Sequence, residues 1–312
     1  MVHATLATPM STPVLYAVCV LIWGTTWFAI TAQIAVLAPE VGVAIRFSLA
    51  GLALAAFCRV RGIALRLPAR AHALVLAQGL LGFCASYVCV YQAERFVVSG
   101  VVAVGYAASP LFGLVLARMF LGTRMSGRVA VGGVAGIVGV TLIFGHEFAR
   151  LTASSEVLWG GGLTAASVLL SSLATIAAAR YHRLGVDGWA PLAWAMVEGG
   201  AAAGLLALVE RRPWGWAWTP GFLGSLAWLA LAGSIAAFGA YFVLVRRIGP
   251  ARAGYIGVVT PVVALAVSSA LEGFAWTGQT VAGIALAILG NVVALWPGTK
   301  APPEAMPSLQ PD

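Results

Sequence analysis

The stretch PVLYAVCVLIWGTTWFAITAQIA, residues 13–35, contains no Asp, Glu, Lys or Arg. An α-helix needs about 20 apolar residues to cross the hydrocarbon core of a bilayer, so this stretch is long enough to span one. It is too long for the apolar region of a signal peptide, and no Lys or Arg precedes it. The stretch therefore predicts an uncleaved first transmembrane helix after an N-terminal tail, residues 1–12.

The rest of the chain has the same character. Hydrophobic residues make up 61% of the sequence and charged residues only 9%, with a mean hydropathy of +0.96. A soluble domain carries about 25% charged residues, so this chain must be covered by lipid. Nine more apolar segments follow the first, and the sequence predicts an all-α polytopic membrane protein with ten transmembrane helices. The further segments are 40–58, 73–93, 98–119, 129–146, 157–179, 189–209, 222–244, 252–271 and 277–296.

Basic residues favour one set of the gaps between these segments. Thirteen of the 18 Lys and Arg residues lie in alternate gaps and the C-terminal tail, four lie in the other gaps, and Arg46 lies inside a segment. Cytoplasmic loops carry the excess of Lys and Arg, so both termini are expected in the cytoplasm and the protein in the inner, cytoplasmic membrane. The charge of +8 sits in short membrane-flanking gaps, which argues against a nucleic-acid partner. The tail, residues 297–312, is rich in Pro and polar residues and is expected to be disordered.

The two halves of the sequence resemble each other. A shift of 151 residues superposes an arginine, a proline and five glycine pairs without a gap. These pairs are Gly82/Gly233, Arg95/Arg246, Pro110/Pro261, Gly122/Gly273, Gly127/Gly278, Gly132/Gly283 and Gly139/Gly290. Five spans in each half, residues 13–147 and 157–296, make the second half enter the membrane from the opposite side. Such an inverted repeat is typical of secondary transporters that work by alternating access.

The chain resembles the drug/metabolite transporter superfamily and its EamA family of ten-helix permeases. The resemblance depends on Trp23-Gly24-Thr25-Thr26-Trp27, on Arg46-Phe47, and on the two proline-containing segments that are each followed by a glycine-rich last span. It implies two inverted five-helix repeats around a central cavity that carries metabolites, often outward. One branch of the family exports amino acids, including aromatic ones.

Two charged residues lie well inside predicted spans, Arg46 and Glu198. A charge near the middle of a bilayer is costly, so each needs a partner or a watery cavity. Both are candidate substrate-binding residues. Glu198 is also the candidate for proton coupling, because a carboxyl group in apolar surroundings can hold a proton at working pH. The alternative is that each charge only holds helices together.

Aromatic and hydroxyl groups supply the other candidate binding residues, which would suit a hydrophobic or aromatic solute. Trp23, Thr26 and Trp27 share one helical face, and Tyr87 and Tyr91 share another. The remaining candidates lie in the fourth, sixth and ninth segments: Tyr106, Ser172 and Tyr255. For all of them the alternative is helix packing.

Proline and glycine mark possible sites of bending and of close packing. Pro110 and Pro261 each remove a backbone hydrogen bond and are hinge candidates, with a static kink as the alternative. Gly132 and Gly136 form a G-x-x-x-G stripe, which predicts close contact with the tenth segment. We expect a monomer, with a homodimer through such a stripe as the alternative.

Signatures of enzymes and of bound cofactors are missing from the sequence. It contains no nucleotide-binding P-loop and no H-E-x-x-H, and the four cysteines have no metal-ligand spacing. No catalytic residue, metal or cofactor is therefore expected. The best functional prediction is a transporter of a small, partly hydrophobic metabolite, with amino acids the best guess. The alternatives are a channel, a lipid scramblase and a membrane-embedded lipid-processing enzyme.

Overall fold

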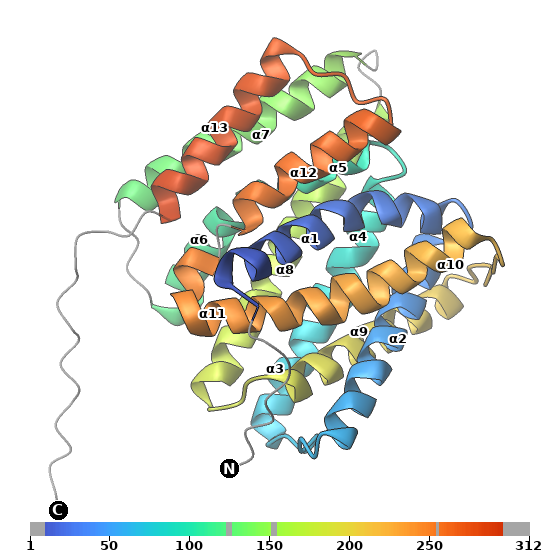
Figure 1. Cartoon of the computed structure of the whole chain (residues 1–312). Helices are drawn as coiled ribbons and strands as arrows, with labels where there is room; N and C mark the ends of the chain where they lie inside the picture. The colour runs from blue at the N-terminus through green and yellow to red at the C-terminus, as the bar shows by residue number, and fades with distance from the viewer. Residues whose placement is uncertain (1–9, 123–126, 151–154, 254–255, 296–312) are drawn as a thin grey trace, which may run out of the picture.

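The computed structural model describes residues 10–122, 127–150, 155–253 and 256–295, and the part it describes is helical with no strand (Figure 1). The first half contains α1 (Thr12–Ile34), α2 (Pro39–Val60), α3 (Ala69–Gln78) with η1 (Gly79–Ser86) and α4 (Tyr87–Ala93), α5 (Ser99–Gly105) with η2 (Tyr106–Ala108) and α6 (Ser109–Leu121), and α7 (Gly127–Arg150). The second half contains α8 (Ser155–Arg183), α9 (Trp189–Val209), α10 (Pro220–Ala227) with η3 (Trp228–Ala236) and α11 (Ala237–Ala253), α12 (Ile256–Leu271) and α13 (Gly278–Leu295).

Most of these helices are long and apolar enough to cross a bilayer. Within the described residues, six satisfy the requirement alone: α1, α2, the run Ala69–Ala93, α8, α9 and the run Pro220–Leu244. A seventh span forms if Ser99–Ala108 and Leu111–Leu121, which meet at a 40° bend, are counted together. Three shorter apolar helices lie at Val131–Ile143, Val259–Leu271 and Gly278–Val293. Each of the ten predicted segments therefore coincides largely with a helix.

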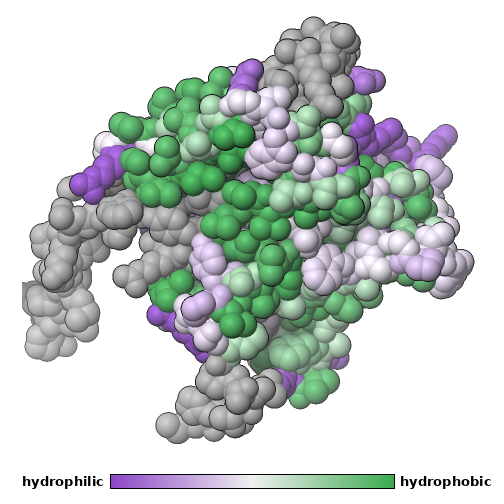
Figure 2. Space-filling model, turned by 45° about the horizontal axis from the view of Figure 1, so that its top comes forward, coloured by the Kyte–Doolittle hydropathy of each residue, from purple (hydrophilic) through white to green (hydrophobic). Residues whose placement is uncertain are grey.

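Large apolar side chains cover much of the outside. Figure 2 shows broad apolar areas, with polar residues gathered mainly toward the edges of the molecule. Leu52, Val131 and Leu205 are each at least 60% exposed. A soluble monomer rarely exposes continuous apolar surface of this extent, whereas lipid tails cover it without cost. The protein is therefore a multi-span membrane protein, as predicted.

Glycine allows two helix pairs to pack backbone against backbone. α7 lies along α13, where a Cβ atom added at Gly139 would stand 2.6 Å from the amide nitrogen of Ala287. A Cβ added at Gly290 would stand 2.6 Å from the amide nitrogen of Gly136. The predicted contact between the fifth and tenth segments is confirmed. α2 crosses α9 in the same way, at Gly51 and Gly200.

Local backbone features recur in the two halves at the predicted offset. The π-helical segments η1 and η3 overlap when the first is shifted by 151 residues. Gly122 and Gly273, 151 residues apart, both adopt left-handed conformations, with φ of 70° and 71°. Pro110 lies in the first turn of α6, and Pro261 lies inside α12. The sequence match therefore coincides with irregular features of the fold and not only with repeated composition.

The boundaries differ from the prediction at several places. The helix that ends in α11 continues to Ala253, through residues that the sequence assigned to a loop and to the start of the ninth segment. α3 begins at Ala69, so His72, one residue before the predicted start of the third segment, lies inside a helix. Apolar length sets the span, but a helix continues beyond it as long as its backbone bonds can form. The two tails, residues 1–9 and 296–312, lie outside the described residues.

Replacing Gly139 by alanine should destabilise the protein, because the new methyl group would meet the backbone of α13. We expect a loss of about 1–3 kcal/mol from overpacking. Gly136→Ala in the same helix is the matched control, since its Cβ would have no neighbour within 4 Å. Thermal unfolding in detergent measures both. Equal unfolding temperatures would contradict the backbone contact between α7 and α13.

Candidate functional site

Aromatic side chains from both halves gather in the middle of the bundle. We call them the central aromatic cluster, and its members are Trp23, Trp27, Phe47, Phe83, Tyr87, Tyr106 and Phe238. Phe47 contacts Phe83 and Tyr87 at ring-centroid distances of 5.0 and 4.6 Å. Four of the predicted binding residues, Trp23, Trp27, Tyr87 and Tyr106, belong to this cluster. Sequence reasoning missed Phe83 and Phe238, because an apolar residue in a span has no distinguishing signal.

The predicted face of the first span lies against η3. The indole Nε1 of Trp23 donates to the carbonyl oxygen of Gly233 at 3.0 Å. A Cβ atom added at Gly233 would stand 2.7 Å from a methyl carbon of Thr26, whose hydroxyl donates to its own helix at Trp23. The π-helical turn of η3 supplies the carbonyl that accepts the Trp23 indole, so Trp23 and Thr26 join the two halves of the molecule.

Arg46 projects from α2 into the cluster and is 2% exposed. Its guanidinium carbon lies 4.8 Å from the ring centroids of both Phe47 and Tyr87. Its Nε and Nη1 atoms are buried and have no hydrogen-bond partner. Contacts with aromatic rings stabilise the cation, but they leave these two donors unsatisfied.

The hydroxyl of Tyr91 and the carboxylate of Glu94, near Arg46, also lack hydrogen-bond partners. Tyr91 is fully buried in α4, and its hydroxyl has no partner with hydrogen-bond geometry. Glu94 follows α4 directly and is 8% exposed, and both of its carboxylate oxygens lack partners. Arg46 lies close enough to act electrostatically on both. Sequence reasoning placed Glu94 in a gap between spans and missed it, because linear position does not show that the end of α4 is covered.

The hydroxyl candidates occupy places where their own neighbours satisfy them. Tyr106 shares a hydrogen bond of 3.0 Å with Ser86, which donates to the carbonyl oxygen of Ser167 at 2.9 Å. Ser172 in α8 donates to the carbonyl oxygen of Val168 in its own helix. The Ser172 hydroxyl is therefore satisfied within α8. Tyr255 lies outside the described residues.

Glu198 is separate from Arg46 and is paired with histidine. Its Oε1 lies 2.6 Å from Nε2 of His72 in α3, while its Oε2 is buried without a partner. The pair borders a pocket of about 590 Å³ at the end where α2 leaves the bundle. The pocket is lined by Arg59, Ile63, Leu65, Arg66, Leu67, His72 and Trp194. The partner of Glu198 is therefore a residue just outside the predicted third segment, which begins at residue 73.

Polar contacts close the opposite end of the bundle, between α5 and α12. We call this end, which carries Glu40, Glu94, Glu210 and Glu272, the glutamate end. The Glu272 carboxylate accepts from the Ser99 amide at 3.2 Å, from the Ser99 hydroxyl at 2.5 Å and from the Ser268 hydroxyl. We call Ser99, Ser268 and Glu272 the serine–glutamate latch. It ties the start of α5 to the end of α12, whereas α6, further along, packs against α8.

A second ionic link at the glutamate end lies in the loop that follows α9. Arg212 donates through Nε to Glu210 at 2.9 Å and lies 3.4 Å from a carboxylate oxygen of Glu40. The bond to Glu210, with the nearby charge of Glu40, raises the pKa of the Arg212 guanidinium. Glu40 also accepts from Gln92 at 2.8 Å. These contacts join α2, α4 and the loop after α9.

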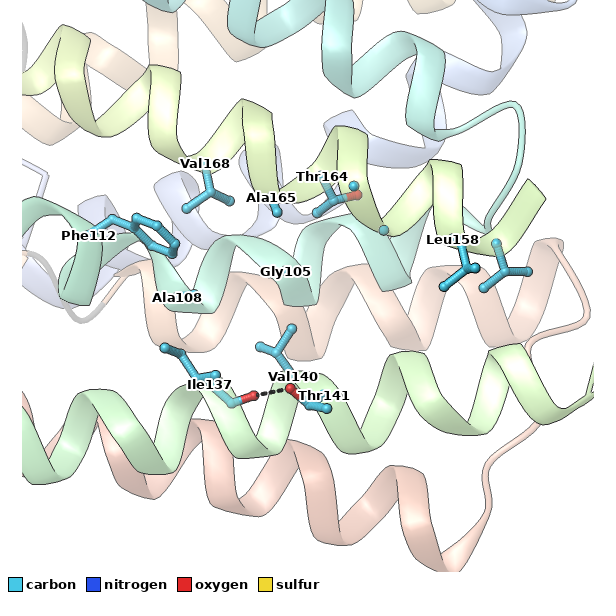
Figure 3. A pocket seen from close by; sticks show the side chains of 13 residues that line it. Gly105, Ala108, Phe112, Ile137, Val140, Thr141, Leu158, Thr164, Ala165 and Val168 are labelled. Carbon is cyan, nitrogen blue, oxygen red and sulfur yellow. Dashed lines mark hydrogen bonds between the residues drawn. The ribbon is translucent and has the colours of Figure 1, made fainter. Parts of the chain in front are cut away.

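An apolar pocket of about 480 Å³ lies away from the cluster, between η2, α6, α7 and α8 (Figure 3). Its two hydroxyl groups, Thr141 and Thr164, donate to carbonyl oxygens of their own helices, at Ile137 and Gly160. The exposed Ile137 and Leu158 stand at its edge. The pocket therefore offers a solute no free polar group and suits lipid tails.

The two hinge candidates differ in their surroundings. Pro110 lies at the 40° bend between Ser99–Ala108 and Leu111–Leu121, directly after the 3₁₀ turn of η2. Pro261 lies inside α12, whose helix continues on both sides of it. Proline cannot donate a backbone hydrogen bond, and the bend near Pro110 lies where that hydrogen bond is lost.

Comparisons with known proteins agree with this architecture. The EamA-like transporter family matches residues 11–145. The inner membrane transporter YedA of Escherichia coli strain K12 is 31% identical over 280 residues, covering 88% of this chain and 85% of YedA. A transporter of Archaeoglobus fulgidus is 23% identical over 288 residues, covering 90% of this chain and 98% of that protein.

A solved crystal structure has the same fold. It superposes with a TM-score of 0.66 at 20% sequence identity, covering 92% of this chain and 98% of the other. The family is one of transporters and not of enzymes, which confirms the prediction that the protein is not an enzyme. The chain belongs to the EamA-like transporter family and is a multi-pass membrane transporter.

Proposed function

We propose that the protein is a secondary transporter of ten spans, built as two inverted five-helix repeats, with both termini in the cytoplasm. The shared offset of the π-helical segments and of Gly122 and Gly273 supports the repeat. The family match over residues 11–145 is close to the first proposed repeat, residues 13–147. The relative YedA is an inner membrane transporter, which supports the same membrane for this chain.

The proposed substrate is a small, partly hydrophobic metabolite, with amino acids as the best guess. The gathering of one buried arginine with the central aromatic cluster carries this proposal. Aromatic walls suit an apolar side chain, and a guanidinium suits a carboxylate. A phosphate ester would call for several buried cations, and Arg46 is the one buried Arg or Lys among the described residues. Outward transport is what the family resemblance implies.

Purified protein in liposomes should carry amino acids but not sugars or phosphate esters. Aromatic amino acids should compete best, because Tyr87 and Phe47 can stack on their rings. A radiotracer flux assay with a panel from the three classes measures this. Tyr87→Ala should weaken the aromatic preference, while Trp159→Ala, on the exposed surface of α8, serves as control. Transport of phosphate esters without amino acids would contradict the proposal.

The proposed mechanism is alternating access, and it requires the serine–glutamate latch to open. The hydroxyl oxygens of Ser99 and Ser268 are 3.2 Å apart, so cysteines at both positions can meet. In a chain without its native cysteines, oxidation of Ser99→Cys/Ser268→Cys should reduce flux by about tenfold or more, because α5 and α12 can no longer separate at the glutamate end. Reductant should restore it.

The two single variants control for the loss of the hydroxyls. Mass spectrometry of the oxidised protein confirms the disulfide. Full flux through the cross-linked double variant would contradict alternating access at this latch and would indicate a channel.

We further propose that Glu198 takes up the coupling proton, with His72 as its partner. The two side chains share a short contact beside a pocket that the proposed orientation places at the cytoplasmic end. Arg59 and Arg66 are the other basic groups that line that pocket.

A pH gradient should stimulate flux in the native protein, and Glu198→Gln should remove that stimulation because an amide cannot exchange a proton. His72→Gln should reduce the stimulation as well. Glu156→Gln, at an exposed position in α8, is the matched control. Uptake into proteoliposomes with and without the gradient measures the effect. Unchanged gradient dependence in Glu198→Gln would show that Glu198 is not the coupling group.

A further inference from the structure

Two buried groups of opposite charge in this protein lack partners. Arg46 has two unsatisfied donors, and Glu94 has two unsatisfied carboxylate oxygens. Each side chain is at least nine-tenths buried. A buried charge without hydrogen bonds destabilises a folded protein, and in natural proteins such groups are almost always paired. Helix packing alone does not explain why Arg46 and Glu94 are buried without hydrogen-bond partners.

The two groups belong to one region but do not meet. Arg46 comes from α2 and Glu94 from the end of α4, and these helices pack together. Neither Glu94 oxygen bonds to Arg46. The Tyr91 hydroxyl, one turn before Glu94, faces Arg46 without reaching hydrogen-bond geometry. Unsatisfied donors on α2 and unsatisfied acceptors at the end of α4 therefore belong to two helices that pack together.

We propose that Arg46 and Glu94 bind the two charges of a zwitterionic substrate, a free α-amino acid. This inference deepens the proposed function and rests on it. The substrate carboxylate accepts from the unsatisfied N–H groups of Arg46, and its ammonium donates to Glu94. The rings of Phe47 and Tyr87, which already flank the guanidinium, lie against the substrate side chain.

Other ligand chemistries fit these groups less well. A sugar would neutralise neither Arg46 nor Glu94. A simple carboxylic acid would neutralise Arg46 but not Glu94. Two other glutamates cannot serve as the second charge: Glu198 is engaged with His72, and the buried Glu40 is engaged with Gln92 and Arg212. Glu94 is therefore the acidic counterpart that the zwitterion requires.

The proposed site is joined to the latch by a short loop. Glu94 follows α4, and Ser99, which with Ser268 holds the Glu272 carboxylate, begins α5. Substrate bound at Glu94 would therefore lie a few residues along the chain from the contacts that close the glutamate end.

Counterflow in proteoliposomes with labelled L-phenylalanine tests the proposal. The competitors are unlabelled phenylalanine, N-acetylphenylalanine, which lacks the ammonium, and phenethylamine, which lacks the carboxylate. For the native protein only phenylalanine should compete well. Removing either charge should weaken competition by about tenfold or more, the usual worth of a hydrogen bond to a charged group.

The variants should separate the two charges. Glu94→Gln should lose phenylalanine affinity by about tenfold yet accept N-acetylphenylalanine comparatively better, because the unpaired carboxylate is gone. Arg46→Gln should shift preference toward phenethylamine. Glu156→Gln, which changes an exposed glutamate at the start of α8, should behave as the native protein. Thermal unfolding in detergent identifies any variant that does not fold, and Arg46→Lys then replaces Arg46→Gln.

The outcomes distinguish two failures. If the folded protein carries no member of a wider panel of amino acids, sugars and phosphate esters, the proposed function fails and the site with it. If amino acids are carried but the blocked compounds compete equally, or Glu94→Gln keeps native affinity and selectivity, only the zwitterion site is overturned.

Discussion

The arrangement of the centre depends on backbone contact between α9 and its two neighbours. A Cβ atom at Gly199 would stand 2.6 Å from the carbonyl oxygen of Gly79, and one at Gly200 would stand 2.6 Å from the amide nitrogen of Ser48. Lipid tails are as apolar as leucine, so helices in a bilayer associate through such close packing and not through exclusion of water. Because α9 lies this near to α2 and η1, it sets the spacing between Phe47 and Phe83. The central aromatic cluster is built on that spacing.

The π-helical segments give the centre its polar contacts without breaking the spans. In η3 the hydroxyl of Ser234 donates to the carbonyl oxygen of Leu229, five residues earlier, and Gly233 accepts from the Trp23 indole. Such segments are common at functional sites, because they free backbone groups and turn side chains relative to the regular helix. Here η1 and η3 occupy corresponding positions in the two halves, and each contributes to the central aromatic cluster or to its immediate neighbours.

The sequence predicts the helices well and their partners poorly. Apolar length predicts each span within a few residues, since the bilayer sets that length independently of the rest of the fold. The WGTTW motif and Arg46 also identify true central residues. The pairing of Glu198 with His72, and the burial of Glu94, are set by which helices become neighbours. Linear depth along one helix cannot show this, so the sequence identifies Arg46 and Glu198 as charges inside spans without showing which side chains each of them contacts.

Helix pairs in the bundle differ in how closely their backbones pack. α7 with α13, and α2 with α9, are joined through glycines at backbone distance, where no rearrangement of side chains can take up a displacement. α5 and α12 also pack closely, at Gly100, where an added Cβ would stand 3.0 Å from the Cα of Leu265, and hydrogen bonds to the Glu272 carboxylate join them further at the glutamate end. The chain from α5 to α6 is the one that bends, at Pro110. Under the proposed mechanism α6 therefore moves relative to α5 at this bend, while the glycine-joined pairs keep the substrate groups of α2 in place.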